Sequence, residues 1–220
     1  MERLAKYANN FILEQVPNEV IERAKLLLLD SIAAIAYGNQ YKNISKITSS
    51  FTQENSSEGF NKVPVIGTNS FLDVQKASLI NGLAMVSFEL DEGNPKAKGH
   101  PAAHFLPALL SLAIANRISG KQFLEAFIVN YEISARLGAT INLNQEIHPH
   151  GNWGVVGNGF GVGKLLNWQE EESINGSLLS SSFAFPTLWK SVLEGHEVRN
   201  VIIGLNNLHT TILPNLVKSG

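Results

Sequence analysis

Apolar positions recur at helical spacing along most of the chain. In the segment 19–38, EVIERAKLLLLDSIAAIAYG, Val20, Ala24 and Leu27 fall on one face of a helix. Gly38 follows the last turn, and glycine is typical of the residue that ends a helix. The pattern predicts a long, buried helix in this segment.

The same spacing predicts further helices, whereas strand-like alternation is scarce. Helices are expected at residues 44–51, 71–90, 102–118 and 121–137, near Trp153, from Glu170, and from Val192 onward. Only KVPVIG at 62–67 resembles a strand, and Pro64 restricts it to a sheet edge because proline lacks an amide hydrogen. Irregular segments are expected at 53–59 and 142–152. The predicted fold class is therefore all-α, with helices packed in layers.

Composition narrows the possible functions. The 220 residues include 17 Lys and Arg against 19 Asp and Glu, so no overall basic field exists to bind nucleic acid or an anionic membrane. Cysteine is absent, which excludes disulfides, thiolate metal sites and a cysteine nucleophile. No apolar run reaches the about 18 residues of a membrane span. The N-terminal sequence lacks the apolar core of a signal peptide, so we expect a cytoplasmic protein.

The segment 88–104, FELDEGNPKAKGHPAAH, concentrates titratable side chains in a sparsely charged chain. Glu89, Asp91 and Glu92 are expected at the end of the helix predicted for 71–90, where a carboxylate is unfavourable by the helix dipole. Crowded carboxylates also raise one another's pKa. This arrangement favours a general acid or base near neutral pH.

A carboxylate-binding site is indicated a few residues later. His100 stands at a predicted helix start, before Pro101, with Lys96 and Lys98 close upstream. Free amide groups at a helix N-terminus, together with these cations, would favour a bound carboxylate. The alternative is a solvated loop that carries ordinary charges.

Histidine spacing offers a second interpretation. His100 and His104 are four residues apart, as in helical metal sites, but Pro101 replaces the glutamate of zinc peptidases. For His104 alone, the favoured explanation is a histidine hydrogen-bonded within the core. A metal-dependent hydrolase that uses His100, His104 and His148 with Asp91 therefore stays as an alternative.

The glycine-rich segment 154–164, GVVGNGFGVGK, fits neither nucleotide-binding pattern. The P-loop pattern would need glycine in place of Asn158 and a hydroxyl residue in place of Leu165. The spacing instead predicts a helix with two small faces that let neighbouring helices approach closely. These faces are formed by Gly157 with Gly161 and by Gly159 with Gly163.

Taken in order, five segments resemble the MmgE/PrpD family, which includes 2-methylcitrate dehydratase, cis-aconitate decarboxylase and iminodisuccinate epimerase. They are RAKLLLLDSIAAIAYG, ASLINGLAMVSFELDEGNPKAKGHPAAHFLPALLSLA, SGKQFLEAFIVNYEISARLG, IHPHGNWGVVGNGFGVGKLLNW and LWKSVLEGHEVRNVIIGLNN. The family's acidic-aromatic-acidic-acidic-threonine turn and Gly-His-Pro fall on residues 89–93 and 99–101. Gly93 replaces the usual threonine, and Glu89 replaces an aspartate.

The resemblance implies roles for individual residues. The family's second histidine falls on His148, followed by His150 as an extra candidate, and its late lysine falls on Arg199. Expected catalytic residues are Asp91, His100 and His148, and expected substrate-binding residues are Glu89, Lys96, Lys98, His150 and Arg199. The implied chemistry needs no cofactor or metal: a proton is moved next to a carboxylate of a small di- or tricarboxylic acid, in dehydration, decarboxylation or epimerisation.

The resemblance also implies a domain organisation. Residues 1–220 correspond to the family's helical domain and end before its α+β lid, so the sequence is a fragment, a short active relative, or an inactive remnant that binds a partner chain or a carboxylate. Apolar positions in the last predicted helix would lack their usual covering. Together with the family resemblance, this leads us to expect a homodimer.

Overall fold

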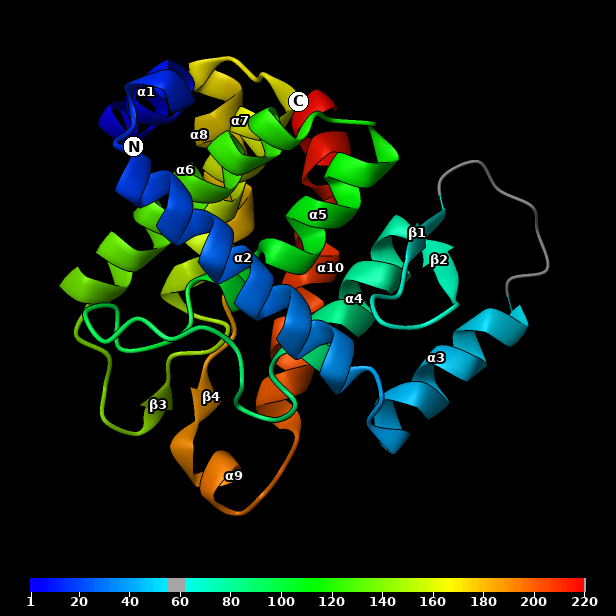
Figure 1. Cartoon of the computed structure of the whole chain (residues 1–220). Coiled ribbons are helices and arrows are strands. Elements are labelled where there is room, and N and C mark those ends of the chain that lie inside the picture. Colours follow the sequence, from blue (N-terminus) through cyan, green and yellow to red (C-terminus); the bar gives the residue numbers. More distant parts are fainter. Residues whose placement is uncertain (55–61, 220) are drawn as a thin grey trace.

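Helices build most of this computed structural model, which describes residues 1–54 and 62–219 (Figure 1). The helices are α1 (Glu2–Asn10), α2 (Asn18–Gly38), α3 (Lys42–Glu54), α4 (Val74–Met85), α5 (Leu106–Ala115), α6 (Gly120–Thr140), α7 (Asn158–Leu166), α8 (Glu170–Ser181), α9 (Trp189–Leu193) and α10 (Val198–Lys218). Two antiparallel strand pairs join β1 (Lys62–Pro64) to β2 (Phe71–Asp73), and β3 (Ile147–His148) to β4 (Thr187–Leu188). The predicted all-α fold and the edge strand at Pro64 are confirmed. Of the irregular segment predicted at 53–59, residues 55–59 lie outside the described residues.

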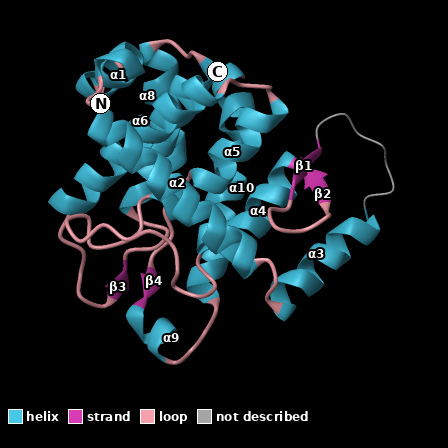
Figure 2. Ribbon diagram, viewed as in Figure 1, coloured by secondary structure: helices cyan, strands magenta, loops and turns pink. Residues whose placement is uncertain are grey.

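The centre of the fold is the packing of α4 against α10. Their backbones approach closely at Gly82, where a Cβ atom would lie 3.0 Å from the Cα atom of Gly204. Ile80 and Ile203 are fully buried beside this contact, and each such side chain contributes about 1.5–3 kcal/mol through burial. Helices α2 and α5 also pack against α4 (Figure 1). The long helices therefore form a packed body, and the loops around β3, β4 and α9 lie at one end of it (Figure 2).

Helix α7 lies between α6 and α8, and its two small faces are confirmed. A Cβ atom at Gly159 would lie 2.0 Å from the amide nitrogen of Ser177 in α8, and one at Gly161 would lie 2.3 Å from Nδ2 of Asn130 in α6. Glycine is therefore required by close packing on both sides, at a cost in helix propensity of about 1 kcal/mol per residue.

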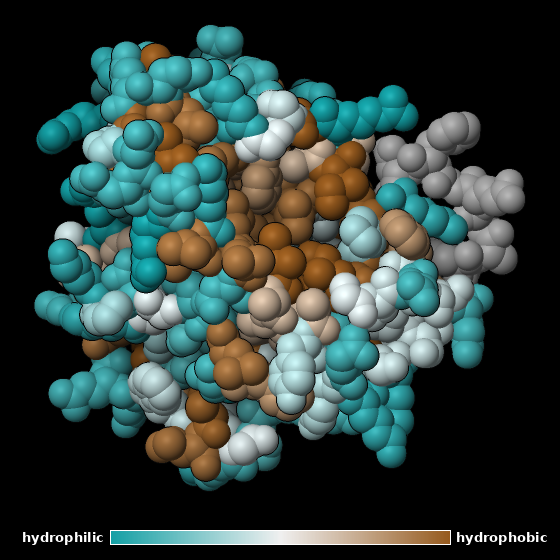
Figure 3. Space-filling view, viewed as in Figure 1, coloured by the Kyte–Doolittle hydropathy of each residue, from teal (hydrophilic) through white to brown (hydrophobic). Residues whose placement is uncertain are grey.

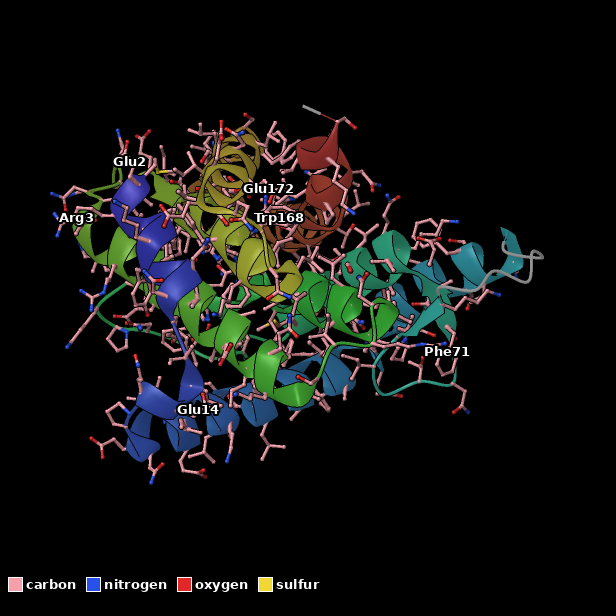
Figure 4. The ribbon with its side chains drawn as sticks, turned by 90° about the horizontal axis from the view of Figure 1, so that it is seen from above. Glu2, Arg3, Glu14, Phe71, Trp168 and Glu172 are labelled. Atoms are coloured by element: carbon pink, nitrogen blue, oxygen red, sulfur yellow. The ribbon has the colours of Figure 1, made fainter. Side chains whose placement is uncertain are left out.

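Trp168 closes the junction between α7 and α8. Its ring fills the space beside Gly163 and Gly176, and only 7% of the residue is exposed. Glu172 lies close by in the view from above (Figure 4), in the capping box that it forms with Gln169 at the start of α8. The helix predicted from Glu170 is thus confirmed.

The helix predicted for 71–90 is shorter at both ends. Residues 71–73 pair with β1, and the carboxylate of Asp73 accepts a hydrogen bond from the amide of Lys76, so it caps α4. The helix ends at Met85. The acidic residues 89–92 therefore follow the helix by several residues, and their predicted placement at its C-terminus was wrong.

The helix predicted for 102–118 is broken. Residues Ala102–His104 form a single 3₁₀ turn, Phe105 leaves the helical region at φ −144°, and α5 begins at Leu106. Pro107 explains the restart, because it has no amide hydrogen to donate to the Ala103 carbonyl. That carbonyl instead accepts a hydrogen bond from Asn207 Nδ2 at 2.8 Å.

The region predicted as one helix from Val192 onward consists of α9 and α10, separated by a turn in which Gly195 has φ +77°. The helix predicted for 121–137 is α6, which does not stop before Gly138 but continues to Thr140. None of the helices in the described ranges is long and apolar enough to cross a membrane.

Apolar side chains also reach the surface. Leu26 and Leu29 of α2 are 57% and 66% exposed. Figure 3 shows a broad apolar area at the centre of the face where α2, α4 and α5 lie in Figure 1. Such a surface is compatible with the predicted homodimer, which stays a prediction.

Candidate active site

Loops gather at one end of the helical body, where β3, β4 and α9 lie (Figure 2). Between them and the segment after α4 is a cleft of about 520 Å³. The cleft is lined by Glu89, Gly93, Asn94, Pro95, Lys98, Gly99, His100, His148, Pro149, Trp189, Val192 and Arg199. It therefore joins residues from three distant parts of the chain.

A tight turn presents the first group of these residues. The Asn94 side chain accepts hydrogen bonds from the amides of Lys96 and Ala97, and the Asn94 backbone pairs with that of Gly99. Lys98 within the turn adopts a left-handed conformation, with φ +58°, which is uncommon for a residue with a side chain. Backbone strain of this kind often accompanies functional sites.

His100 is held against two acceptors. Its Nδ1 lies 2.8 Å from the carbonyl oxygen of Glu92 and 3.0 Å from Oδ2 of Asp91. Burial lowers the pKa of His100, but the Asp91 carboxylate outweighs this, with help from Glu92, and the pKa rises to about 8. His100 is therefore protonated at neutral pH. Since Nδ1 faces the two acceptors, Nε2 is the nitrogen left to exchange a proton with a ligand in the cleft.

Glu92 is buried beneath the turn. Its Oε1 accepts a hydrogen bond from the amide of Ala102 at 2.6 Å, and its Oε2 accepts one from the hydroxyl of Tyr131 at 2.9 Å. Burial raises the pKa of Glu92 to about 8 in spite of these donors. The amide expected to bind a substrate carboxylate after His100 is thus occupied by this internal carboxyl group.

Two successive backbone amides, those of His150 and Gly151, fix the tautomers of His148 and His104. The amide of His150 donates to Nδ1 of His148 at 3.1 Å, and the amide of Gly151 donates to Nε2 of His104 at 3.1 Å. Burial lowers the pKa of both imidazoles to about 4, so both are neutral at pH 7. His148 consequently carries its proton on Nε2 and is a hydrogen-bond donor on the cleft side.

His104 belongs to the core, as one of the two interpretations expected. Its Nδ1 lies 3.0 Å from the carbonyl oxygen of His100, and since Nε2 accepts a bond, Nδ1 carries the proton and donates. Both ring nitrogens are thereby engaged by backbone. His104 holds the His100 backbone in place and has no free nitrogen for a metal ion.

His150 lies behind the cleft wall. It is fully buried, and its ring centroid is 5.3 Å from that of His100 and 4.5 Å from that of His148. Within the described part of the chain, neither of its ring nitrogens has a hydrogen-bond partner. Its ring therefore packs against both of the histidines that line the cleft.

Asp91, His100 and His150 are the described residues that could hold a metal ion, with ligand-type atoms within 4.8 Å of one another. This set differs from the predicted one, because His150 takes the place of His104 and His148. The contacts of His100 with Asp91 and Glu92 already account for its orientation.

Two cationic side chains and a tryptophan also line the cleft. Lys98 is exposed at its edge, and Arg199 projects from the first turn of α10 to form an ion pair with Glu89. Trp189 forms an apolar wall, with its ring centroid 4.3 Å from that of His148. A cleft with cations, a protonated imidazole and a neutral imidazole donor is suited to bind small organic anions.

Comparison with known proteins identifies the family. The MmgE/PrpD N-terminal domain matches residues 2–180. The chain belongs to this family. A cis-aconitate decarboxylase from Aspergillus terreus is 27% identical over 222 residues, covering 91% of this chain and 44% of that protein. A cis-aconitate decarboxylase-like protein, oryM, from Aspergillus oryzae is 32% identical over 133 residues, covering 57% of this chain and 27% of that protein. The chain thus spans less than half the length of these relatives.

The structure of this MmgE/PrpD domain groups most of the predicted site residues. Glu89, Lys98, His100, His148 and Arg199 line the cleft. Asp91 and His150 lie directly behind it, buried against His100. Lys96 is exposed and is not among the lining residues. The predicted roles of all eight residues remain predictions, but seven of them, all except Lys96, lie in or directly behind one cleft.

Sequence reasoning missed Tyr131, which contacts Glu92 from the middle of α6. In the helix predicted for 121–137, Tyr131 occupies one apolar position of a helical face. Nothing in the neighbouring sequence distinguishes it as a site residue. Trp189 was within a family-like segment, but only the pairing of β3 with β4 brings it beside His148.

Proposed function

We propose that the cleft binds a small di- or tricarboxylic acid and that His100 transfers a proton at the carbon next to a carboxylate. The single observation that carries this proposal is that His100 lines the cleft while its Nδ1 is held against buried Asp91 and the Glu92 carbonyl, which leaves Nε2 for a ligand. The family and its decarboxylase-named relatives support lyase chemistry on a carboxylic acid.

Among dehydration, decarboxylation and epimerisation, we favour decarboxylation. Removal of CO₂ consumes a proton and requires an acid, whereas the other two reactions begin with a base that removes a proton from carbon. The two histidines that line the cleft are a protonated His100 and a His148 whose Nε2 carries hydrogen. Both are donors in the resting protein.

In the proposed step the substrate loses CO₂ and gains a proton at the same carbon. The bond between carbon and the departing carboxylate breaks, its electron pair stays on the substrate and is delocalised toward a neighbouring double bond and carboxylate, and CO₂ leaves. The carbanion takes the proton of His100 Nε2, which forms the new C–H bond and leaves His100 neutral. His148 and the cationic side chains stabilise the negative charge that develops on the remaining carboxylates. Solvent then returns a proton to His100.

The test uses the full chain with cis-aconitate and related acids, and NMR to identify products and follow their rate of formation. Replacing His100 with Asn should lower turnover by at least about 10²-fold. His196→Asn is the matched control, because His196 is 61% exposed and is not among the cleft-lining residues. Unchanged turnover in His100→Asn, or no conversion of any of these acids by the unaltered chain, would contradict the proposal.

A further inference from the structure

We propose that Glu89 is an internal competitor of the ligand: its carboxylate occupies Arg199 in the free protein and must be displaced by a ligand carboxylate. This inference rests on the proposed function, because it assigns Arg199 to a second carboxylate of the same ligand. It implies that tight binding is reserved for acids long enough to reach from His100 to Arg199.

The two partners of this ion pair are unequally exposed. The Arg199 side chain is 13% exposed, whereas that of Glu89 is 51% exposed. Arg199 is therefore largely desolvated, and a desolvated cation is costly unless an anion faces it. Glu89 can return to water at little cost. The pair is thus poised to exchange one carboxylate for another at a fixed guanidinium.

The backbone of Glu89 is anchored by packing, whereas its exposed side chain is held by the ion pair with Arg199. The preceding Phe88 packs against two aromatic rings, with centroid distances of 5.0 Å to Tyr37 and 5.4 Å to Tyr41. Glu89 itself has φ +54°, a left-handed conformation that holds the chain in a sharp turn. The half-exposed Glu89 side chain extends from this fixed point to Arg199.

The same cleft contains other cations that a ligand can reach without displacing Glu89. His100 and Lys98 line it together with Arg199, and Lys98 has no ion-pair partner among the described residues. A monocarboxylate can bind at His100 and Lys98 without disturbing Glu89. A di- or tricarboxylate gains Arg199 as well, but only after it breaks the internal pair, so part of its interaction energy is lost.

Removing the competitor should therefore tighten binding only for ligands that reach Arg199. In Glu89→Gln, the dissociation constant of citrate, used as a tricarboxylate probe, should fall about five- to tenfold at neutral pH. The dissociation constant of acetate, a monocarboxylate probe, should change by less than about twofold. In an Arg199→Gln background, Glu89→Gln should no longer tighten citrate binding, since the pair is already absent.

Titration calorimetry of the full chain with both probes tests this. Glu132→Gln is the matched control, because it makes the same change in net charge and breaks another Arg–Glu pair, with Arg136, outside the cleft. Equal citrate affinity in Glu89→Gln and the unaltered chain would overturn the inference, as would an equal gain in the Arg199→Gln background or in Glu132→Gln. Weaker citrate binding in Glu89→Gln would also overturn the inference, and would instead favour Glu89 as a direct contact of the ligand. No citrate binding by any variant would contradict the proposed function itself.

Discussion

The hydroxyl of Tyr131 donates a hydrogen bond of 2.9 Å to Oε2 of Glu92, and so joins the middle of α6 to the turn that carries His100. The backbone of Glu92 takes part in the same connection, because its carbonyl oxygen accepts the Nδ1 proton of His100. The orientation of His100 thus depends on a buried carboxyl group anchored to the helical body.

Glu92→Gln should stabilise the protein at alkaline pH. Burial raises the pKa of Glu92 from 4.5 to about 8. The folded state therefore favours the protonated acid, and its stability is fully present below about pH 4.5 and declines as pH rises to about 8. Glutamine keeps an acceptor for the Ala102 amide and cannot ionise. The free energy of unfolding should rise by on the order of 5 kcal/mol at about pH 9 and change little near pH 4.5.

Denaturant unfolding of both proteins across this pH range provides the measurement. The difference in unfolding free energy should grow with pH and level off above about pH 8. A difference that is constant with pH, or a loss of stability at alkaline pH, would show that Glu92 is ionised in the folded protein.

Asp91→Asn should lower the pKa of His100. The Asp91 carboxylate is the principal cause that raises this pKa to about 8, against the opposing effect of burial. Without the charge, burial dominates and the pKa should fall below its ordinary value of 6.5. NMR titration of the imidazole reports it directly. Activity that needs protonated His100 should then decline at a lower pH than in the unaltered chain, and a His100 pKa unchanged in Asp91→Asn would contradict this account.

The sequence predicted most of the helices because their apolar spacing is local information. Val20, Ala24 and Leu27 identify α2 without knowledge of its neighbours, and the glycines of α7 indicate close packing by their own four-residue spacing. The limits of α4 and α5 were less predictable. They depend on the capping carboxylate of Asp73 and on a carbonyl that bonds to Asn207 instead of continuing a helix.

The site was predicted as a set of residues but not as an arrangement. His100 and His148 were recognised from motifs, yet which nitrogen of His148 carries hydrogen is set by the amide of His150 in the folded loop. The helix-start amide expected to bind substrate is instead bound by Glu92, ten residues earlier. Such choices between competing partners depend on tertiary geometry, which spacing along the chain does not contain.

Gly159→Ala should destabilise the fold without altering the cleft lining. A Cβ atom there would lie 2.0 Å from a backbone nitrogen of α8, so the helices must separate, at a cost of about 3 kcal/mol. The melting temperature should fall by about 6–12 °C. Gly120→Ala is the control, because a Cβ atom there meets nothing within 4 Å and should leave the melting temperature unchanged or raised. Equal melting temperatures for the two variants would contradict the packing described for α7 and α8.

His148 should act through hydrogen-bond donation, and two substitutions separate this role from that of a base. Because the His150 amide occupies Nδ1, the cleft side receives the Nε2 hydrogen, and the pKa of about 4 keeps the ring neutral. Glutamine offers an amide donor of similar reach, so His148→Gln should keep turnover within about tenfold, whereas His148→Ala should lose about 10²-fold or more. Turnover of both variants on the acid converted by the unaltered chain is compared at saturating substrate. Equal, large losses in both variants would indicate that the imidazole itself accepts a proton, and dehydration or epimerisation, which begin with a base, would then be favoured over decarboxylation.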